Sequence, residues 1–388
     1  MESILLFGQT KQYMQVLEES RMKKVLLVTN IPSPYRVDLF FYLQTHIKQY
    51  EFYVMYCARE ADNRCWNVDN TKLLNSFFTK TKVIPIRRKY DTKHIYIPKG
   101  IGKDLSDINP DIVIGWEYNP IAIRCLLWCK CHGKKYISLT DGTLYSERNI
   151  NIIQRITRKI IIGKCDASIA SSTKAKEKLL NWGISPNRIF VSLLTVDVNK
   201  IRAIKHDPER GRILYVGSMI ERKGLDLLVS ALRYVDEDFQ LRIVGNGTDK
   251  EIEELKTRIK NANIEDNIVF CGYKEGRELI EEYQKAQIFV LPTREDCFGL
   301  VLLEALCAEV PIISSKYADG AYDVIYEGKN GILVDPYDSK EFGSTINKVL
   351  KKEISLDGKD DIIVEKFTFD EVSKGYINAI DYVLKGEK

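Results

Sequence analysis

The sequence predicts an α/β fold with two doubly wound, Rossmann-like domains that face each other across a cleft. The chain has 388 residues, of which 45% are hydrophobic and 29% are charged, so it has the composition of a globular protein and the length for more than one core. Short apolar, β-branched runs alternate with helical patterns, as they do in parallel βαβ units. These units form two series, and a polar, aperiodic segment, residues 195–211, lies between them.

The two series supply the strands of two sheets. In the first series the expected strands are residues 24–30, 52–57, 82–86, 111–116, 135–140, 167–172 and 188–193. In the second series they are residues 212–217, 241–245, 267–272, 288–292, 311–315 and 331–335. We therefore expect a first domain at residues 22–200 and a second at residues 201–366, while residues 1–21 form an appendage ahead of the first strand.

The composition argues against a membrane-spanning or secreted protein. No apolar run approaches the roughly 20 residues that cross a bilayer, and an acid precedes the short apolar stretch near the start, unlike a secretory signal. Nine cysteines in such a chain indicate free thiols in a reducing cytoplasm. Cys125, Cys129, Cys131 and His132 lie close enough to suggest zinc, but their spacing matches no common zinc pattern, and we expect thiols packed as small hydrophobic groups.

Charge is distributed unevenly along the chain. Residues 1–200 contain 31 Lys and Arg against 18 Asp and Glu, whereas residues 201–388 contain 27 against 36. A basic first half favours an anionic partner, either a nucleic acid or an anionic membrane surface. No nucleic-acid-binding motif occurs in the sequence, so we expect the membrane surface and no nucleic acid.

The loops that follow strands are the candidate sites, because ligands of open α/β sheets bind beyond the carboxyl ends of the strands. The loop after residues 212–217 ends in Arg222 and Lys223 at the entry to a helix, where a cation and the helix dipole favour a phosphate. The next strand runs into Asn246 and Gly247, whose turn lets the backbone approach a ligand closely. The alternative is that Lys223 is a solvated cation of a loop and that Asn246 and Gly247 only form a turn.

The richest segment is “REDCFGLVLLEALCAEVPII”, residues 294–313. Phe298, Gly299 and Leu300 should open a helix whose free amides suit a phosphate. Glu304 lies about a turn and a half into this apolar helix, where neighbouring hydroxyls of a ligand could donate to it, and Asp296 could hold a second hydroxyl cluster. Two polyhydroxy groups joined by phosphates describe a nucleotide sugar. The alternative is Asp296 as a helix cap and Glu304 as a buried ion-pair partner.

“TREDCFGLVLLEALCAEVPII”, “YVGSMIERKGLDLLVSAL” and “IVGNG” resemble, in order and in spacing, the donor-domain motifs of retaining glycosyltransferases of family 4. Members of this family carry the glycosyl transferases group 1 domain and have the GT-B fold. The resemblance covers roughly residues 24–388, and “IPSPYR” (31–36) resembles a subset that builds bacterial surface polysaccharides. It implies that a C-terminal helix, residues 367–388, crosses back to the first domain.

The resemblance also assigns roles to residues. Glu304 would bind ribose hydroxyls, Asp296 the donor sugar, and Lys223 the phosphates of the departing nucleotide. The implied donor-binding residues are Gly217, Ser218, Arg222, Lys223, Asn246, Gly247, Gly272, Tyr273, Asp296, Cys297, Phe298, Gly299, Leu300 and Glu304. The implied catalytic residues are Lys223, Asp296, Glu304 and Asp141, and the acceptor-side candidates are Ser33, Tyr35, Arg36 and Glu117.

The sequence departs from the family pattern at three positions. Asp296 stands where the family has Glu, which shortens the side chain by one methylene and leaves the sugar preference open. Ser218 stands where many members have a phosphate-binding arginine, a charge that Arg222 could supply. The acceptor-side histidine is absent, and Asp141 lies nearest its position. For Asp141 and Glu117 a structural role and a functional role remain equally open.

The expected function is retaining transfer of a sugar from a UDP- or GDP-linked donor to a glycan or lipid-linked acceptor in capsule, O-antigen or exopolysaccharide synthesis. Cationic side chains would replace a metal, and the D-x-D at residues 236–238 precedes a strand, so we expect no metal cofactor. Residues 151–164 and 87–100 combine cations with apolar side chains, so a cytoplasmic protein on the membrane periphery is expected; a core helix with a solvated basic face is the alternative.

Two other functions fit the same motifs. A nucleotide-sugar 2-epimerase on this fold would change the donor without any acceptor. A non-catalytic partner subunit would bind the nucleotide sugar without turnover, and the departures at Ser218 and Asp141 keep this alternative open.

Overall fold

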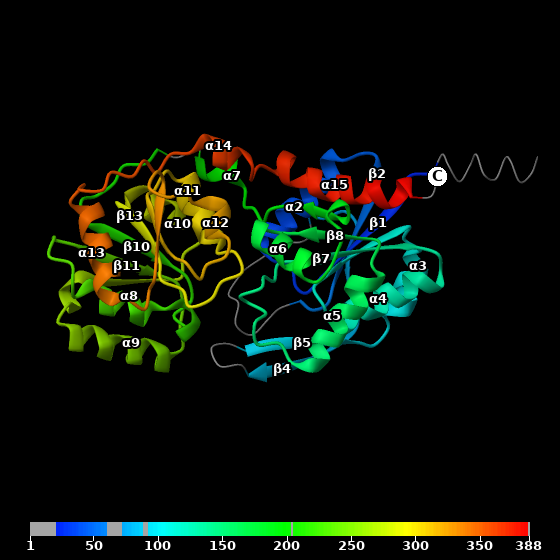
Figure 1. The fold of residues 1–388 in the computed structure, drawn as a ribbon, viewed down its shortest axis with the longest axis horizontal. Helices are drawn as coiled ribbons and strands as arrows, with labels where there is room; N and C mark the ends of the chain where they lie inside the picture. Colours follow the sequence, from blue (N-terminus) through cyan, green and yellow to red (C-terminus); the bar gives the residue numbers. More distant parts are fainter. Residues whose placement is uncertain (1–20, 60–71, 88–91, 203–204, 387–388) are drawn as a thin grey trace, which may run out of the picture.

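The structure, a computed structural model, describes residues 21–59, 72–87, 92–202 and 205–386. It contains two α/β lobes side by side (Figure 1). The appendage expected at residues 1–21 lies outside the described residues except for Arg21, and so does part of the basic segment at residues 87–100. Among the described residues, no helix has the length and apolar character needed to cross a membrane.

The described residues of the first lobe form a seven-stranded parallel sheet. Its order is β3 (Ser76–Phe78), β2 (Tyr50–Tyr56), β1 (Lys23–Thr29), β6 (Ile112–Trp116), β7 (Lys135–Thr140), β8 (Ala167–Ala170) and β9 (Ile189–Val191). The central strands are buried along most of their length, because helices cover both faces of the sheet. The change of strand order between β1 and β6 marks the switch point where such sheets bind ligands.

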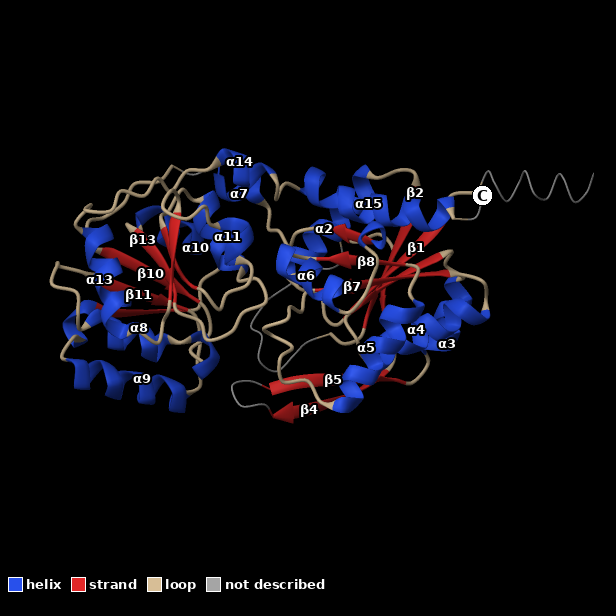
Figure 2. Ribbon diagram, in the orientation of Figure 1, coloured by secondary structure: helices blue, strands red, loops and turns tan. Residues whose placement is uncertain are grey.

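One predicted strand of the first lobe does not belong to this sheet. Residues 82–86 lie in β4 (Thr81–Arg87), which pairs antiparallel with β5 (Thr92–Pro98) in a separate ribbon. Figure 2 shows this ribbon apart from the large sheet. Its β4 strand contains Pro85, which has no amide to donate to a neighbour and suits an exposed ribbon better than the interior of a sheet.

The described residues of the second lobe form a six-stranded parallel sheet that matches the six predicted strands. Its order is β12 (Ile268–Gly272), β11 (Gln240–Val244), β10 (Arg212–Val216), β13 (Ile288–Leu291), β14 (Ile312–Ser315) and β15 (Gly331–Val334). Every neighbouring pair is parallel. The segment expected to be aperiodic, residues 195–211, contains the short helix α7 (Val198–Arg202), whose Val198 and Ile201 pack into the second lobe.

Helices cover both faces of each sheet. In the first lobe α2 (Pro34–His46) and α15 (Phe369–Lys385) share one core, and the opposite face carries α3 (Ile101–Ile108), α4 (Pro120–Cys131), α5 (Ile152–Lys164) and α6 (Thr173–Asn181). In the second lobe one face carries α8 (Leu225–Leu232), α9 (Asp249–Ala262) and α13 (Ser339–Leu350), and the other carries α10 (Gly276–Lys285), α11 (Leu300–Cys307), α12 (Ala321–Val324) and α14 (Asp361–Glu365). Short 3-10 turns lie at Pro186–Arg188, Glu221–Lys223 and Glu265–Asn267.

The carboxyl-terminal helix ties the lobes together. After α14 on the second lobe, α15 runs along the first lobe and contacts α2, β8 and β9 (Figure 1). Ser192 and Thr195, on the chain between the lobes, donate their hydroxyls to the carbonyls of Val372 and Phe367. The linker is therefore held against the returning helix, and the strand ends of the two sheets face one another.

Candidate functional site

The site lies where the loop after β7 meets the loops after β13 and β14. Several contacts cross between the lobes here. Tyr145 donates its hydroxyl to the carbonyl of Arg294 at 3.3 Å, and Arg148 Nη1 lies 2.6 Å from Glu295 Oε2. The Thr143 hydroxyl donates to the carboxylate of Asp319. These contacts fix the acceptor-side loop beside residues 294–296 of the second lobe.

Asp296 occupies the centre of a charged cluster. Lys223 Nζ lies 2.6 Å from its Oδ2 and Arg222 Nη1 lies 3.8 Å from the same atom, while the Phe298 amide donates to Oδ1 at 3.3 Å. Burial by itself would raise the pKa of this carboxyl, but the charges of Lys223 and Arg222 outweigh it and lower the pKa to about 2. Three residues predicted to share a donor site therefore meet.

The start of α11 follows directly. Gly299 adopts a left-handed conformation, with φ of 77°, and this turns the chain into the helix. Among the described residues, no side chain caps the helix, so its first amides have the arrangement that favours an anion. Phe298 is buried beneath this turn, and Gly320 lies so close that a Cβ there would be 2.3 Å from the Phe298 carbonyl oxygen.

Glu304 projects from the second turn of α11. The Tyr283 hydroxyl, on α10, donates to its Oε2 at 2.8 Å. Burial raises the pKa of Glu304, against the lowering effect of this hydrogen bond. No salt bridge formed by the described residues includes Glu304, so its partner is a hydroxyl group and not the cation of the alternative prediction. Hydrogen bonds from further hydroxyl groups would stabilise the ionised form of this buried carboxylate.

The remaining donor-side residues line neighbouring strand ends. Two of them follow β10, two lie in the turn after β11 and two lie at the end of β12: Gly217 and Ser218, Asn246 and Gly247, and Gly272 and Tyr273. The Met219 amide donates to the Asn246 carbonyl at 2.9 Å, which joins the first two loops. Gly245 comes so close to Gly217 that a Cβ would lie 1.9 Å from the Gly217 carbonyl oxygen, so the turn requires glycine.

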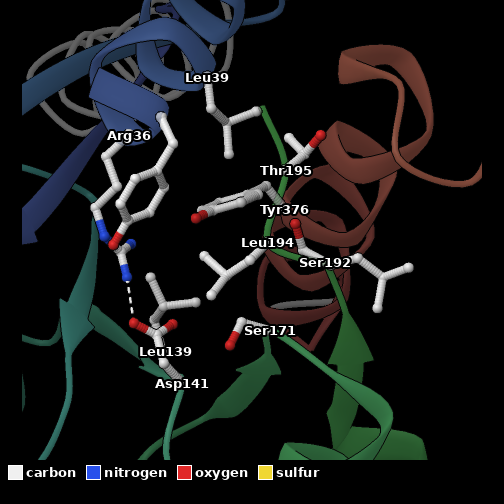
Figure 3. A pocket seen from close by; sticks show the side chains of 11 residues that line it. Arg36, Leu39, Leu139, Asp141, Ser171, Ser192, Leu194, Thr195 and Tyr376 are labelled. Carbon is white, nitrogen blue, oxygen red and sulfur yellow. Dashed lines mark hydrogen bonds and ion pairs between the residues drawn. The ribbon is translucent and has the colours of Figure 1, made fainter. Parts of the chain in front are cut away.

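Asp141 opens the loop after β7 on the acceptor side. Its Oδ2 accepts from Arg36 Nη2 at 2.6 Å (Figure 3). The same oxygen accepts from Trp116 Nε1 at 2.9 Å. Burial would lower the pKa of the Arg36 guanidinium, but the charge of Asp141 outweighs it and the pKa is raised. Oδ1 of Asp141 is buried without a hydrogen-bond partner among the described residues, which leaves one acceptor atom of the carboxylate unused.

Glu117 supports this loop from the preceding strand. It has a left-handed backbone, with φ of 57°, and its Oε1 accepts from the amides of Asp141 and Gly142 at 2.7 and 3.2 Å. Oε1 also accepts from the Thr140 hydroxyl at 3.1 Å. Of the two roles left open by the sequence, this geometry favours a structural role for Glu117, which positions Asp141.

The pocket next to Asp141 contains two further predicted residues. Tyr35 and Arg36 from the start of α2 and Tyr376 from α15 line it (Figure 3). Ser33, the residue before α2, is buried, and its hydroxyl oxygen has no partner among the described residues. The returning helix thus contributes to the acceptor side, which no sequence motif indicated.

Cys297 marks the place where the two halves of the site converge. Burial raises the pKa of its thiol to about 12, and Asp296, Glu117 and Asp141 all lie close enough to act in the same direction. Ser146, in the loop after β7, hydrogen-bonds the thiol. Asp296, Asp141 and Glu117, which belong to three separate segments of the sequence, therefore lie around one point between the lobes.

Sequence reasoning missed several residues of the site. Trp116, Tyr145, Arg148, Tyr283 and Asp319 each contact a predicted residue or cross between the lobes. Their partners are far away in the chain, so no local sequence motif identifies these five residues. The one available signal was Glu304 itself, because an acid in an apolar helix requires a donor from another element.

Comparison with known proteins agrees with this architecture. Residues 197–363 match the profile of the glycosyl transferases group 1 family. The lipopolysaccharide 1,6-galactosyltransferase of Escherichia coli (strain K12) is 26% identical over 348 residues, which cover 87% of this chain and 91% of that protein. The corresponding enzyme of Salmonella typhimurium (strain LT2) is 27% identical over 335 residues, which cover 84% and 87%.

Solved structures share the fold over almost the whole chain. The apo form of the lipopolysaccharide outer core galactosyltransferase WaaB has a TM-score of 0.72 and 20% identity, covering 92% of this chain and 99% of that one. Anabaena Alr3699/HepE in complex with UDP has a TM-score of 0.74 and 15% identity, covering 93% and 100%. The chain therefore has the GT-B fold of these glycosyltransferases, and its residues 197–363 match the glycosyl transferases group 1 family.

Proposed function

We propose that the protein transfers a glycosyl group, with retention of anomeric configuration, from a nucleoside diphosphate sugar to a hydroxyl of a glycan or lipid-linked acceptor. The observation that carries this proposal is the meeting of Lys223, Arg222 and Asp296 beside the uncapped start of α11. Two cations and a set of helix amides suit a diphosphate, and an adjacent carboxylate suits sugar hydroxyls. The Anabaena structure with the same fold is a complex with UDP, which supports a nucleotide-linked donor.

Each group then has a task in the reaction. Negative charge accumulates on the departing diphosphate, and Lys223, Arg222 and the amides at Gly299 would stabilise it. Lys223 pairs with Asp296 in this structure, so the donor would take over the ammonium group and leave the Asp296 carboxylate to the sugar. The Glu304 carboxylate would accept hydrogen bonds from the hydroxyls of the ribose. Because cations already neutralise the diphosphate, we propose that the reaction needs no divalent metal.

On the acceptor side, Asp141 would hold the attacking hydroxyl or a hydroxyl of the donor sugar through its unpartnered Oδ1. Arg36 and Trp116 fix the position of the carboxylate, and Glu117 fixes the backbone that carries it. The contacts of Thr143, Tyr145 and Arg148 with the second lobe would keep water away from the bound donor.

The two lipopolysaccharide galactosyltransferase relatives support a place in the synthesis of a bacterial surface polysaccharide, such as capsule, O-antigen or lipopolysaccharide. A cytoplasmic protein at the inner face of an anionic membrane would fit such an acceptor. The first half of the chain is basic, which suits this location.

A transfer assay tests the proposal. The protein is incubated with UDP- and GDP-linked sugars and a lipid-linked or oligosaccharide acceptor, with and without excess chelator, and the anomeric configuration of the product is read by NMR. Retained configuration and full activity in chelator are expected. An altered sugar still linked to its nucleotide, formed without acceptor, would instead establish an epimerase, and donor binding without turnover would establish a partner subunit.

A further inference from the structure

Helix α5 exposes an apolar stripe on the outside of the first lobe. Its exposed members are Ile152, Ile153, Ile156 and Ile160, with 68, 70, 51 and 38% of their surface accessible. Their spacing places them on one side of the helix, whereas Ile161 and Ile162 pack inward. Exposing four isoleucines of one helix to water is energetically unfavourable, so this face has the character of a docking surface.

Cations accompany the stripe and acids do not. Arg155, Lys159 and Lys164 are exposed on the same helix. From Arg148 to Cys165 the sequence contains no Asp or Glu. Arg148 and Arg155 also line a depression with Leu144, which is 45% exposed, and with Glu147, whose carboxylate pairs with Arg158. An apolar stripe with basic flanks has the chemistry of a helix lying in the interface of an anionic bilayer.

The neighbouring elements extend the same surface. Helix α4 contacts both α5 and β5, so the ribbon and the two helices lie on one side of the lobe. In Figure 1 they run along its lower edge, away from α15. Leu127 on α4 is 48% exposed, and Val83, Ile86 and Ile97 on the ribbon are each 39% exposed.

The inner side of α5 connects this surface to the acceptor side of the site. Arg158 forms a bidentate pair with Glu147, at 2.6 and 2.8 Å, in the loop that starts at Asp141. Lys178 is fully buried and donates to Thr140 Oγ1 at 2.7 Å, with Glu147 Oε1 at 3.3 Å. A surface that binds α5 would therefore lie close to Asp141, because the inner side of α5 pairs with the loop that starts at Asp141.

We infer that α5 docks on a lipid bilayer with anionic headgroups, its isoleucines entering the interface while Arg155, Lys159 and Lys164 meet the phosphates. A second copy of the chain is a poorer occupant, because pairing this basic, acid-free face with itself would bring like charges together. The inference deepens the proposed function and rests on it: docking would present a lipid-linked acceptor to the loop that carries Asp141.

Co-sedimentation of the full chain with vesicles of phosphatidylglycerol and phosphatidylcholine tests this inference. The test variant combines Ile153→Ser with Ile156→Ser, and the matched control is Ile362→Ser, an isoleucine of α14 that is 74% exposed on the second lobe. We expect the double variant to bind vesicles at least tenfold more weakly than the wild type and the control to bind equally. Replacing Arg155 and Lys159 with Gln should weaken binding and reduce its salt dependence.

Failure of wild-type binding, or equal binding by the double variant, would overturn the inference. A wild type that is dimeric in solution and becomes monomeric in the double variant would assign the face to a second copy instead. UDP and GDP binding without vesicles, measured by thermal shift, verifies that each variant is folded. It also separates the two proposals, because vesicle binding without nucleotide binding would count against the proposed function alone.

Discussion

Asp319 provides a pH-dependent test of the contact between the lobes. Its carboxylate is 6% exposed, accepts from Thr143 of the other lobe, and its backbone amide donates to the Asp296 carbonyl at 2.9 Å. Burial raises the pKa of Asp319 from 3.8 to about 6. Asp296 and Glu295 act in the same direction, while the Thr143 hydrogen bond and the charge of Lys174 oppose it.

The sign of the effect follows from the higher pKa in the folded protein. The folded state binds the proton of Asp319 more tightly, so the stability contributed by the neutral acid is fully present below about pH 4 and is lost as the pH rises through 6. A shift of about two units corresponds to roughly 3 kcal/mol. Asp319→Asn removes the ionisation and weakens one hydrogen bond by about 1 kcal/mol, leaving a gain of roughly 2 kcal/mol at pH 7.5.

Urea unfolding at intervals between pH 4.5 and 7.5 measures this difference. The variant should be more stable than the wild type at pH 7.5, and the advantage should disappear toward pH 4.5. Asp238→Asn, at an exposed aspartate, is the control and should leave the pH dependence unchanged. Parallel stability curves for wild type and Asp319→Asn across this range would refute the reasoning.

Three further outcomes are expected. Gly245→Ala should lower the free energy of unfolding by about 2 kcal/mol or more, because its Cβ would meet the Gly217 carbonyl at 1.9 Å; unchanged urea midpoints would contradict this. Lys178→Met should lower the free energy of unfolding by roughly 3 kcal/mol, because it breaks a buried ion pair with Glu147. A much smaller loss of stability in calorimetry would contradict this. Asp141→Asn should reduce kcat by about 100-fold with little change in nucleotide Kd; unimpaired turnover would exclude its proposed role.

The second lobe could be predicted from the sequence almost strand by strand. Its strands are short and separated by helices, and β10, β13 and β14 are buried on both faces, so they are visible as apolar runs bounded by turn residues. The strand predicted at residues 82–86 was placed in the sheet wrongly, because an apolar run has the same appearance in a ribbon and in a sheet, and its partner β5 was not predicted. Pro85 was the available warning, since its missing amide disfavours a central strand.

The donor side of the site was predictable for a related reason. Lys223, Asp296 and Glu304 lie at strand ends and on the helix that follows, where position in the chain determines position in the fold. The pairing of Lys223 with Asp296 was not predicted, because the two belong to different βα units. Likewise, the sequence left the role of Glu117 open, since its carboxylate meets the amides of Asp141 and Gly142 only after β6 and β7 pair.

The acceptor side depends on long-range packing to a greater extent. Arg36 reaches Asp141 from the start of α2, and Tyr376 arrives on a helix from the far end of the chain. Such contacts arise from the strand order and from the packing of α15, whose return the family resemblance implied without indicating which of its side chains reach the site. Cleft residues that lie outside strand-end motifs are accordingly those that the sequence did not reveal.

The most direct test of the central claim is nucleotide binding at the cluster of Lys223, Asp296 and Glu304. Thermal stability would be measured against UDP, GDP and ADP for the wild type, Lys223→Ala and Glu304→Ala, with Lys250→Ala as a control at an 84% exposed lysine of α9. A nucleotide at about 100 times its dissociation constant should stabilise the wild type and the control by roughly 2.7 kcal/mol. Much smaller shifts are expected for Lys223→Ala and Glu304→Ala. Equal stabilisation of all four proteins would place the nucleotide elsewhere and contradict the account.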